Sequence, residues 1–223
     1  MLFNKTPVRG LIFDMDGVLI DSEPLHLLAY QEVLATMGIA YAEEDNRELL
    51  GRKELDCAKI LIKRYNLRCT PEELVREKES IMERLLKTQS NERPGVSSIL
   101  SAAKNLGLPM AVASSATLAT INLVVDILSI RPFFKALASG EEVKHGKPAP
   151  DVFILAAERI GVDPTHCLVI EDTFNGVVAA KAAGMQCIAI PCEATRHQDH
   201  SQADAMLTSL TELQLEDWCP ANS

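Results

Sequence analysis

The chain contains one short apolar run that ends abruptly in two aspartates, and this run limits the possible folds more than any other segment. Residues 11–13 are Leu-Ile-Phe, which is the composition of a buried strand, and Asp14 and Asp16 follow directly before Gly17. A buried parallel strand brings the residues at its carboxyl end to the ligand-binding edge of an open α/β sheet. Two carboxylates held together repel unless a cation or a shared proton relieves them. Taken alone, the segment fits either a reactive pair of acids or a solvated strand end before an Asp-Gly turn.

The region from residue 92 onward alternates between segments with strand composition and segments with helical patterns. Strands are expected at 110–113, 166–170 and 186–190, with a weaker one at 133–138. Helices are expected at 96–106, 118–128, 151–160 and 177–183. Such alternation is typical of a parallel sheet covered by helices. The sequence therefore predicts an α/β fold, with a Rossmann-like parallel sheet and helices on both of its faces.

Between the first strand and this alternating region, the sequence shows only helical patterns. The last of them opens at Thr70, a residue type that caps helix N-termini, and Pro71 follows at the first helical position. We therefore predict two domains. Residues 1–22 and 92–223 form the catalytic core, and residues 23–91 form an inserted all-helical domain.

Charge and cysteine content exclude several classes of partner. The 223-residue chain has a formal net charge of −9, whereas nucleic acids and anionic membranes are bound by basic surfaces, so neither is an expected partner. Six cysteines are scattered without a CxxC pair, which is typical of buried thiols in a reducing compartment. The sequence has no apolar run of about 18 residues that could span a membrane, and its first residues do not form an apolar signal region. We expect a cytoplasmic monomer.

Four of the expected strands end in polar residues, and one lysine stands in the loop between the last two. The polar residues are Asp14 with Asp16, then Ser114, then Glu141, then Glu171 with Asp172. Lys147 lies between a glycine and a proline, just before a helix is expected to begin. Because the carboxyl ends of parallel strands meet at one edge of a sheet, these side chains are expected to share a single cleft.

The acidic members of this set have the chemistry that phosphoryl transfer needs. Asp14 is a nucleophile that is ionised at neutral pH, since its reference pKa is near ~4. Asp16 can protonate the leaving oxygen and later deprotonate a water molecule. Glu171 and Asp172 add hard oxygen ligands that, together with Asp14, would hold Mg²⁺. An acidic pair after a strand can also simply offset the dipole of the next helix.

The remaining members are candidates for binding the transferring phosphoryl group. Ser114, the backbone N–H groups beside it at Ser115, and Lys147 supply donors and positive charge for the phosphoryl oxygens. Each has an ordinary alternative, because serines after a strand often cap the next helix and a lysine in a Gly/Pro-rich loop is often only solvated. The functional interpretation depends on all of these residues occurring in order, each at the end of an alternating element.

Four segments together resemble the motifs of the haloacid dehalogenase (HAD) superfamily, in its phosphatase and β-phosphoglucomutase-like branch. The segments that resemble the first to fourth motifs are, in order, FDMDGVLIDSE at 13–23, VASSA at 112–116, KPAPDVF at 147–153 and VIEDTFNGVVAAKAAGM at 169–185. The likeness extends over almost the whole chain. It implies a HAD-like core with an α-helical cap domain inserted after the first motif.

The resemblance also implies roles for the site residues. Asp14 is the nucleophile that forms an aspartyl-phosphate, and Asp16 is the general acid and base. Mg²⁺ is bound by Asp14, the backbone carbonyl of Asp16, and Asp172, with Glu171 assisting. Ser114 and Lys147 become phosphate ligands. In this family the cap closes over the site and contacts the leaving group.

In the predicted cap, the residues expected to face the substrate are His26 and the loop of Gly51, Arg52, Lys53 and Glu54. A histidine matching His26 acts near the general acid in related sugar-phosphate mutases, although a solvent-facing helix histidine is an equal alternative. Those mutases carry an arginine for a second phosphate where this chain has Glu54. Hydrolysis of a small phosphorylated metabolite, a sugar or polyol phosphate, is therefore favoured over isomerisation.

Two other classes of protein fit the sequence less well than this enzyme. A catalytically silent binding protein is disfavoured because Asp14, Asp16, Lys147 and Asp172 are all intact. A dehalogenase is weaker still, because such an enzyme has no need of the Mg²⁺-binding acids in the fourth motif. We predict a Mg²⁺-dependent phosphatase, with a sugar-phosphate mutase as the alternative.

Overall fold

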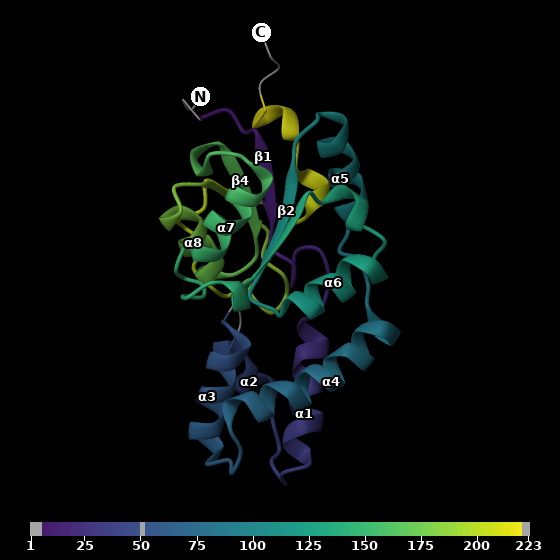
Figure 1. The fold of residues 1–223 in the computed structure, drawn as a ribbon, viewed down its shortest axis with the longest axis vertical. Helices are drawn as coiled ribbons and strands as arrows, with labels where there is room; N and C mark the ends of the chain where they lie inside the picture. Colours follow the sequence, from purple (N-terminus) through teal and green to yellow (C-terminus); the bar gives the residue numbers. More distant parts are fainter. Residues whose placement is uncertain (1–5, 50–51, 220–223) are drawn as a thin grey trace.

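The structure is a computed structural model that describes residues 6–49 and 52–219, so Gly51 of the predicted cap loop lies outside the described residues. A 6-stranded sheet forms the core, in the order β3-β2-β1-β4-β5-β6, and every neighbouring pair is parallel (Figure 1). The strands are β1 (Gly10–Phe13), β2 (Met110–Ser114), β3 (Ala136–Ser139), β4 (Cys167–Glu171), β5 (Gln186–Ala189) and β6 (Ala205–Met206). The predicted α/β class is confirmed.

Helices cover both faces of this sheet. The core helices are α5 (Val96–Asn105), α6 (Leu118–Ile127), α7 (Asp151–Ile160) and α8 (Phe174–Ala182). Successive strand residues point to opposite faces. Leu11 and Phe13 therefore join an apolar cluster with α5, α6 and the C-terminal 3₁₀ turns, whereas Ile12 joins a second cluster with α7 and α8. Both faces are buried, which explains why the strands read as continuous apolar runs.

The order of the strands fixes where a ligand can bind. The chain moves from β1 to β2 and β3 on one side, and then returns to β4 on the other side of β1. Such a reversal leaves a crevice beyond the carboxyl ends of the strands at the switch point. Here that point lies between β1 and β4, which end next to Asp14 and Asp172.

Two core elements differ from the sequence expectation. The weak strand expected at 133–138 is β3 at Ala136–Ser139, because Arg131–Phe133 form a 3₁₀ turn in which the Phe133 N–H donates to Ile130 O at 3.1 Å. Helix α8 begins at Phe174 and not at residue 177, because the Thr173 hydroxyl caps it by accepting from the Gly176 N–H at 3.1 Å.

The residues inserted after β1 fold as helices below the carboxyl edge of the sheet (Figure 1). They are α1 (Glu23–Ala35), α2 (Glu43–Asn46), a 3₁₀ turn (Arg47–Leu49), α3 (Glu54–Tyr65) and α4 (Pro71–Gln89). These helices share their own apolar cluster, which includes Tyr30, Leu34, Leu61 and Leu74. The expected cap at Thr70 is confirmed as a capping box with Glu73. The short helix α2 was not expected.

Two connections join these helices to the core, and they lie side by side. Ile20 forms an antiparallel bridge with Glu92. The Asp21 N–H donates to Asn91 O at 3.2 Å, and the Arg93 N–H donates to Leu19 O at 3.1 Å. Because only two paired segments cross between the parts, a small rotation here would move all four helices together.

All six cysteines are free thiols, and Cys167 and Cys187 are buried in β4 and β5 as expected. Within residues 6–49 and 52–219, none of the helices combines the length and the apolar composition that crossing a bilayer requires.

Candidate active site

The carboxylates predicted from the strand ends meet at the switch point of the sheet. Asp14 continues β1, since its N–H donates to Ile170 O of β4 at 2.9 Å. Asp172 follows β4 and is fully buried. The chain turns away at Gly17, which has a φ of 76° and leaves no room for a side chain, because a Cβ there would lie 2.2 Å from Asp172 Oδ2. The turn after Asp16 therefore needs glycine for both its backbone angle and its contact with Asp172.

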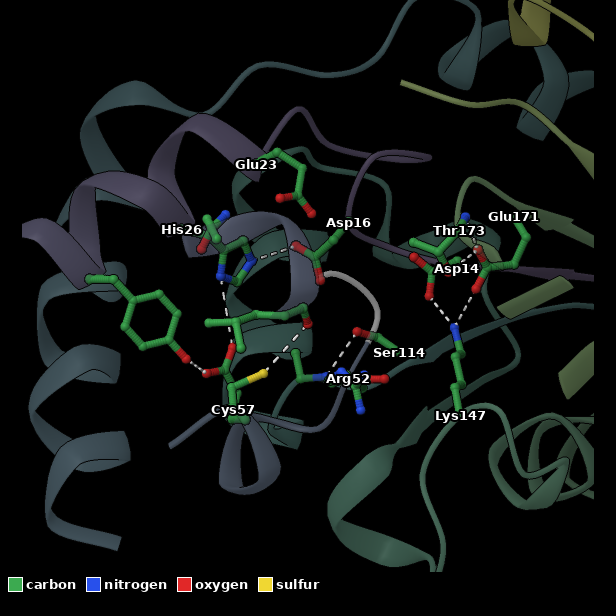
Figure 2. A pocket seen from close by; sticks show the side chains of 16 residues that line it. Asp14, Asp16, Glu23, His26, Arg52, Cys57, Ser114, Lys147, Glu171 and Thr173 are labelled. Carbon is green, nitrogen blue, oxygen red and sulfur yellow. Dashed lines mark hydrogen bonds and ion pairs between the residues drawn. The ribbon is translucent and has the colours of Figure 1, made fainter. Parts of the chain in front are cut away.

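Lys147 points toward Asp14 and Glu171 (Figure 2). Its ammonium forms ion pairs with Asp14 Oδ1 and with Glu171 Oε1, the latter at 2.7 Å, and it lies 4.6 Å from the centre of the Phe153 ring. Although burial alone would lower the pKa of Lys147, the carboxylates of Asp14 and Glu171 raise it. Three buried acids, Asp14, Glu171 and Asp172, thus lie close together, and Lys147 pairs with the first two.

The shortage of positive charge changes the ionisation of the acids. Burial raises the pKa of Asp14 well above its ordinary value, and the Glu171 and Asp16 carboxylates add to this effect against Lys147. Burial and Glu171 likewise raise the pKa of Asp172. A further cation would relieve this repulsion.

The same acids have the arrangement and the donor atoms of a divalent cation site. One carboxylate oxygen each from Asp14, Glu171 and Asp172 lies within 4.8 Å of the others. Asp172 Oδ1 is buried and accepts no hydrogen bond from the residues that the structure describes, while Oδ2 accepts from Thr195 Oγ1 at 3.1 Å. Hard carboxylate oxygens suit Mg²⁺. The residues present therefore fit the expected metal.

Glu171 and Ser114 are held in place by local hydrogen bonds. Glu171 Oε2 accepts from the N–H groups of Asp172 and Thr173, both at 2.7 Å, and from the Thr173 hydroxyl at 3.0 Å. Ser114 Oγ accepts from the Ala116 N–H at 3.1 Å. Ser114 and Ser115 line the same cavity as Asp14 and Lys147. Thr173 also lines the cavity and was not anticipated.

Asp16 faces away from the other acids, toward the inserted helices. Its Oδ1 accepts from the Ser22 hydroxyl, and His26 Nε2 lies 3.3 Å from the same oxygen (Figure 2). Burial would raise the pKa of Asp16, but these two contacts lower it. His26 is mostly buried, so the solvent-facing alternative for this residue is wrong. Burial and Lys78 oppose a charge on His26, yet Asp16 raises its pKa overall.

Behind His26, the cap helices bury an ion pair that sequence reasoning missed. Lys78 Nζ donates to Glu54 Oε1 at 2.6 Å and lies 2.9 Å from His26 Nδ1. The Tyr30 hydroxyl donates to Glu54 Oε2 at 3.1 Å. Against the effect of burial, Lys78 lowers the pKa of Glu54 and Glu54 raises that of Lys78. Only 1% of the Lys78 side chain is exposed, but nothing in the polar run around it distinguishes it from a solvated lysine.

The other predicted cap residues separate in the structure. Glu54, His26 and Arg52 line the cavity, and the Arg52 guanidinium also donates to Glu48 O at 2.8 Å. Lys53 instead reaches the core, where its ammonium donates to Val143 O at 2.8 Å. Glu23 is a further cavity residue that was not predicted. Its Oε2 is buried without a hydrogen bond from the described residues, and burial raises the pKa of Glu23 to about 7.

Comparison with known proteins agrees with this geometry. The family model of haloacid dehalogenase-like hydrolases matches residues 8–184, and the chain belongs to this family. The predicted family is therefore confirmed. The chain is 37% identical to the fructose-1-phosphate phosphatase YqaB of Escherichia coli, covering 80% of this chain and 94% of that protein. It is 35% identical to hexitol phosphatase B of the same organism, covering 94% and 96%.

A solved structure matches the whole arrangement of core and inserted helices. CbbY from Rhodobacter sphaeroides, in complex with phosphate, superimposes with a TM-score of 0.89 at 29% identity. The match covers 95% of this chain and 99% of that one.

Proposed function

We propose that the protein is a Mg²⁺-dependent phosphatase that hydrolyses the phosphomonoester of a small sugar or polyol phosphate. The observation that carries this proposal is the buried cluster of Asp14, Glu171 and Asp172, in which Lys147 pairs with Asp14 and Glu171. Asp14, Glu171 and Lys147 line a cavity that residues of the inserted helices also line. Such a cluster is short of positive charge and suited to a divalent cation and a phosphate. Relatives named as phosphatases of fructose 1-phosphate and of hexitol phosphates support the reaction and the substrate class.

In this proposal Asp14 attacks phosphorus and the ester oxygen leaves with a proton from Asp16. Water then attacks the phosphoryl-aspartate, and Asp16 takes the proton from that water. Asp14, Glu171, Asp172 and the backbone carbonyl of Asp16 would hold Mg²⁺, whose charge offsets that of the carboxylates and the phosphoryl oxygens. Because burial raises the pKa of Asp14, this residue is an effective anion only when further positive charge enters the cluster.

The surroundings of Asp16 favour its role as the base that deprotonates water over its role as the acid that protonates the leaving oxygen. Its lowered pKa favours the anion, which is the form that deprotonates water. His26, which lies 3.3 Å from Asp16 Oδ1 and has a raised pKa, can give Asp16 the proton that Asp16 then passes to the leaving group. Ser114, Ser115 and Lys147 would bind the phosphoryl oxygens from the core side.

The inserted residues 23–91 would act as a cap that selects the substrate. The cavity is lined by side chains of both the core and the inserted residues. Its cap wall carries the polar side chains of Tyr30, Asn46, Arg52 and Glu54, which suit hydroxyl groups. Glu54 already accepts from Lys78 and Tyr30, but a carboxylate has about four acceptor positions, so it can also accept from substrate hydroxyls.

The proposal is tested by phosphate release from a panel of hexose and hexitol phosphates, with fructose 1-phosphate as the first probe. Release should require Mg²⁺, stop in EDTA and return when Mg²⁺ is restored. Full activity in the chelator would contradict the metal requirement. Isomerisation of a hexose phosphate with a bisphosphate activator, without net phosphate release, would establish a mutase. No turnover of any panel member with Mg²⁺ would indicate a binding protein.

A further inference from the structure

Lys53 of the cap lies directly on the loop that carries Lys147. Lys53 is the residue before α3, and its ammonium donates to Val143 O, 90 residues later in the chain, at 2.8 Å. Val143 begins the segment that leads through Gly146 to Lys147. Lys147 in turn contacts Asp14 and Glu171. A cap side chain, Lys53, is therefore connected through the segment 143–147 to the core acids Asp14 and Glu171.

The aliphatic part of Lys53 occupies the place where a side chain at residue 146 would stand. A Cβ on Gly146 would lie 2.5 Å from Lys53 Cγ, 2.8 Å from Cδ and 3.0 Å from Cε. Gly146 is not among the glycines with a positive φ, so its backbone conformation does not itself require glycine. What requires glycine at this position is the space that the cap lysine takes.

This contact joins the two parts of the molecule and can exist only while the cap lies against the core. We propose that Lys53 and Gly146 form a clasp, in which the lysine stem fits over the glycine and the ammonium binds Val143 O, and that this clasp holds the cap closed with the Lys147 loop in place. Lys53 is then a positioning residue and not a ligand of the substrate. The role of the clasp in turnover rests on the proposed phosphatase activity, but its role in closure does not.

A second cap–core contact means that removing the clasp weakens closure without abolishing it. Glu79 of α4 accepts from the hydroxyls of Thr117 and Thr120 at the start of α6, each at 3.1 Å. That contact lies on the α6 side of the cavity and is unaffected by changes at residues 53 and 146. We therefore expect effects of about tenfold, not complete loss.

The test is a double-variant cycle of Lys53→Ala, Gly146→Ala and the two together. Gly146→Ala alone should collide with Lys53 and lower kcat/KM for a sugar phosphate about tenfold, chiefly through KM. In the Lys53→Ala background the same glycine change should cost almost nothing further, because the colliding side chain is gone. Lys59→Ala is the matched control, since Lys59 is exposed on α3 and pairs with Asp56 three residues away.

Closure is measured directly by energy transfer between dyes on non-natural residues at the exposed positions 63 of the cap and 158 of the core. The transfer efficiency should fall in Gly146→Ala, fall less in Lys53→Ala, and be the same in the double variant as in Lys53→Ala. Fully additive losses in the cycle, or unchanged transfer in Gly146→Ala, would overturn the clasp. If no phosphorylated metabolite is turned over, the proposed function fails while the transfer measurement still decides whether the clasp exists.

Discussion

Two buried clusters of charge face each other across the cavity, and they differ in whether their charges balance. In the core, Asp14, Glu171 and Asp172 lie close together, and Lys147 pairs with Asp14 and Glu171. The pKa values of Asp14 and Asp172 are raised, because burial and mutual repulsion are not compensated. This cluster becomes stable as a set of anions only when a further cation binds.

In the cap-side cluster, each acid has a cation beside it. Glu54 pairs with Lys78, and Asp16 contacts His26. The pKa values of Asp16 and Glu54 are lowered and those of His26 and Lys78 are raised, because each acid has a basic group beside it. The difference shows that buried charge by itself does not identify a reactive site. An uncompensated excess of one sign, next to a group able to react, is more informative.

Replacing the nucleophile should have the largest effect of any single change. Asp14→Asn keeps the shape of the side chain but removes its negative charge and a metal ligand. Turnover of both a sugar phosphate and p-nitrophenyl phosphate should fall about a thousandfold or more, which corresponds to about 4 kcal/mol. Asp126→Asn, at an exposed acid paired with Arg131, is the control and should retain normal rates. A comparable rate in Asp14→Asn would show that the core cluster is not the reactive one.

Breaking the balanced cluster should affect stability more than chemistry. Lys78→Met leaves Glu54 buried without its cation, and loss of one partner of a buried pair costs about 3 kcal/mol in unfolding free energy at pH 7. Since Lys78 lowers the folded pKa of Glu54, the pair stabilises the protein above the unfolded value near 4.5 and less as the pH falls through the folded value.

In Lys78→Met, burial of Glu54 is no longer opposed by Lys78, so this acid takes up a proton as the pH falls. The difference in unfolding free energy between wild type and variant should therefore narrow from pH 7 to pH 4, as measured by urea unfolding. Lys87→Met, at an exposed lysine of the same helix, should differ little from wild type at either pH. If the difference in unfolding free energy between wild type and Lys78→Met did not change with pH, loss of the ion pair would not be the cause of that difference.

Glu23 is the one acid near the cap cluster without a hydrogen bond to its buried Oε2 from the described residues, and it should lower stability at neutral pH. Its pKa is raised from 4.5 to about 7, so the unfolded chain releases the proton first as the pH rises. Each unit is about 1.36 kcal/mol, so the penalty is absent below pH 4.5 and approaches about 3 kcal/mol above pH 7. Glu23→Gln should unfold at higher urea than wild type at pH 8 and at nearly equal urea at pH 4. If wild type and Glu23→Gln were equally stable at both pH 8 and pH 4, the raised pKa of Glu23 would be contradicted.

The smallest expected effect is a change in substrate preference. Glu54→Ala removes a cap-wall acceptor, so kcat/KM should fall about tenfold for a sugar phosphate and less for p-nitrophenyl phosphate, which makes fewer contacts with the cap. Asp56→Ala, at an exposed acid of the same helix, is the control. Equal losses on both substrates would mean that Glu54 acts on the fold of the cap and not on recognition.

The core could be predicted from the sequence because its information is local. Each strand is a short apolar run, and the polar residue after it falls at the same edge of the sheet for every parallel strand. Asp14, Ser114 and Glu171 could therefore be placed together without knowing any long-range contact. Helix α8 begins three residues earlier than the sequence predicts because Thr173 caps it, and the acidic residues just before Thr173 drew the interpretation to the metal site and not to a helix cap.

The cap-side cluster could not be predicted in the same way because its partners are distant in sequence. Lys78 is buried only because Glu54, on another helix 24 residues earlier, lies beside it. Helix α2 is too short for a periodic pattern, and its Asp45 pairs with Arg64 of α3, as does Glu48 of the 3₁₀ turn that follows α2. Lys53 was expected to contact the substrate because it belongs to a loop that was expected to face the substrate. The direction of its side chain instead depends on the space beside Gly146, which exists only in the folded core.

The central claim is that Asp14 accepts the phosphoryl group before water does. The stereochemical course at phosphorus, followed with a phosphorothioate substrate that oxygen isotopes make chiral and that is hydrolysed in water of a third oxygen isotope, tests it most directly. Each in-line displacement inverts the configuration, so attack by Asp14 followed by attack by water predicts net retention. Net inversion would show that water attacks the substrate directly, and the core cluster would then be a metal site without a covalent intermediate.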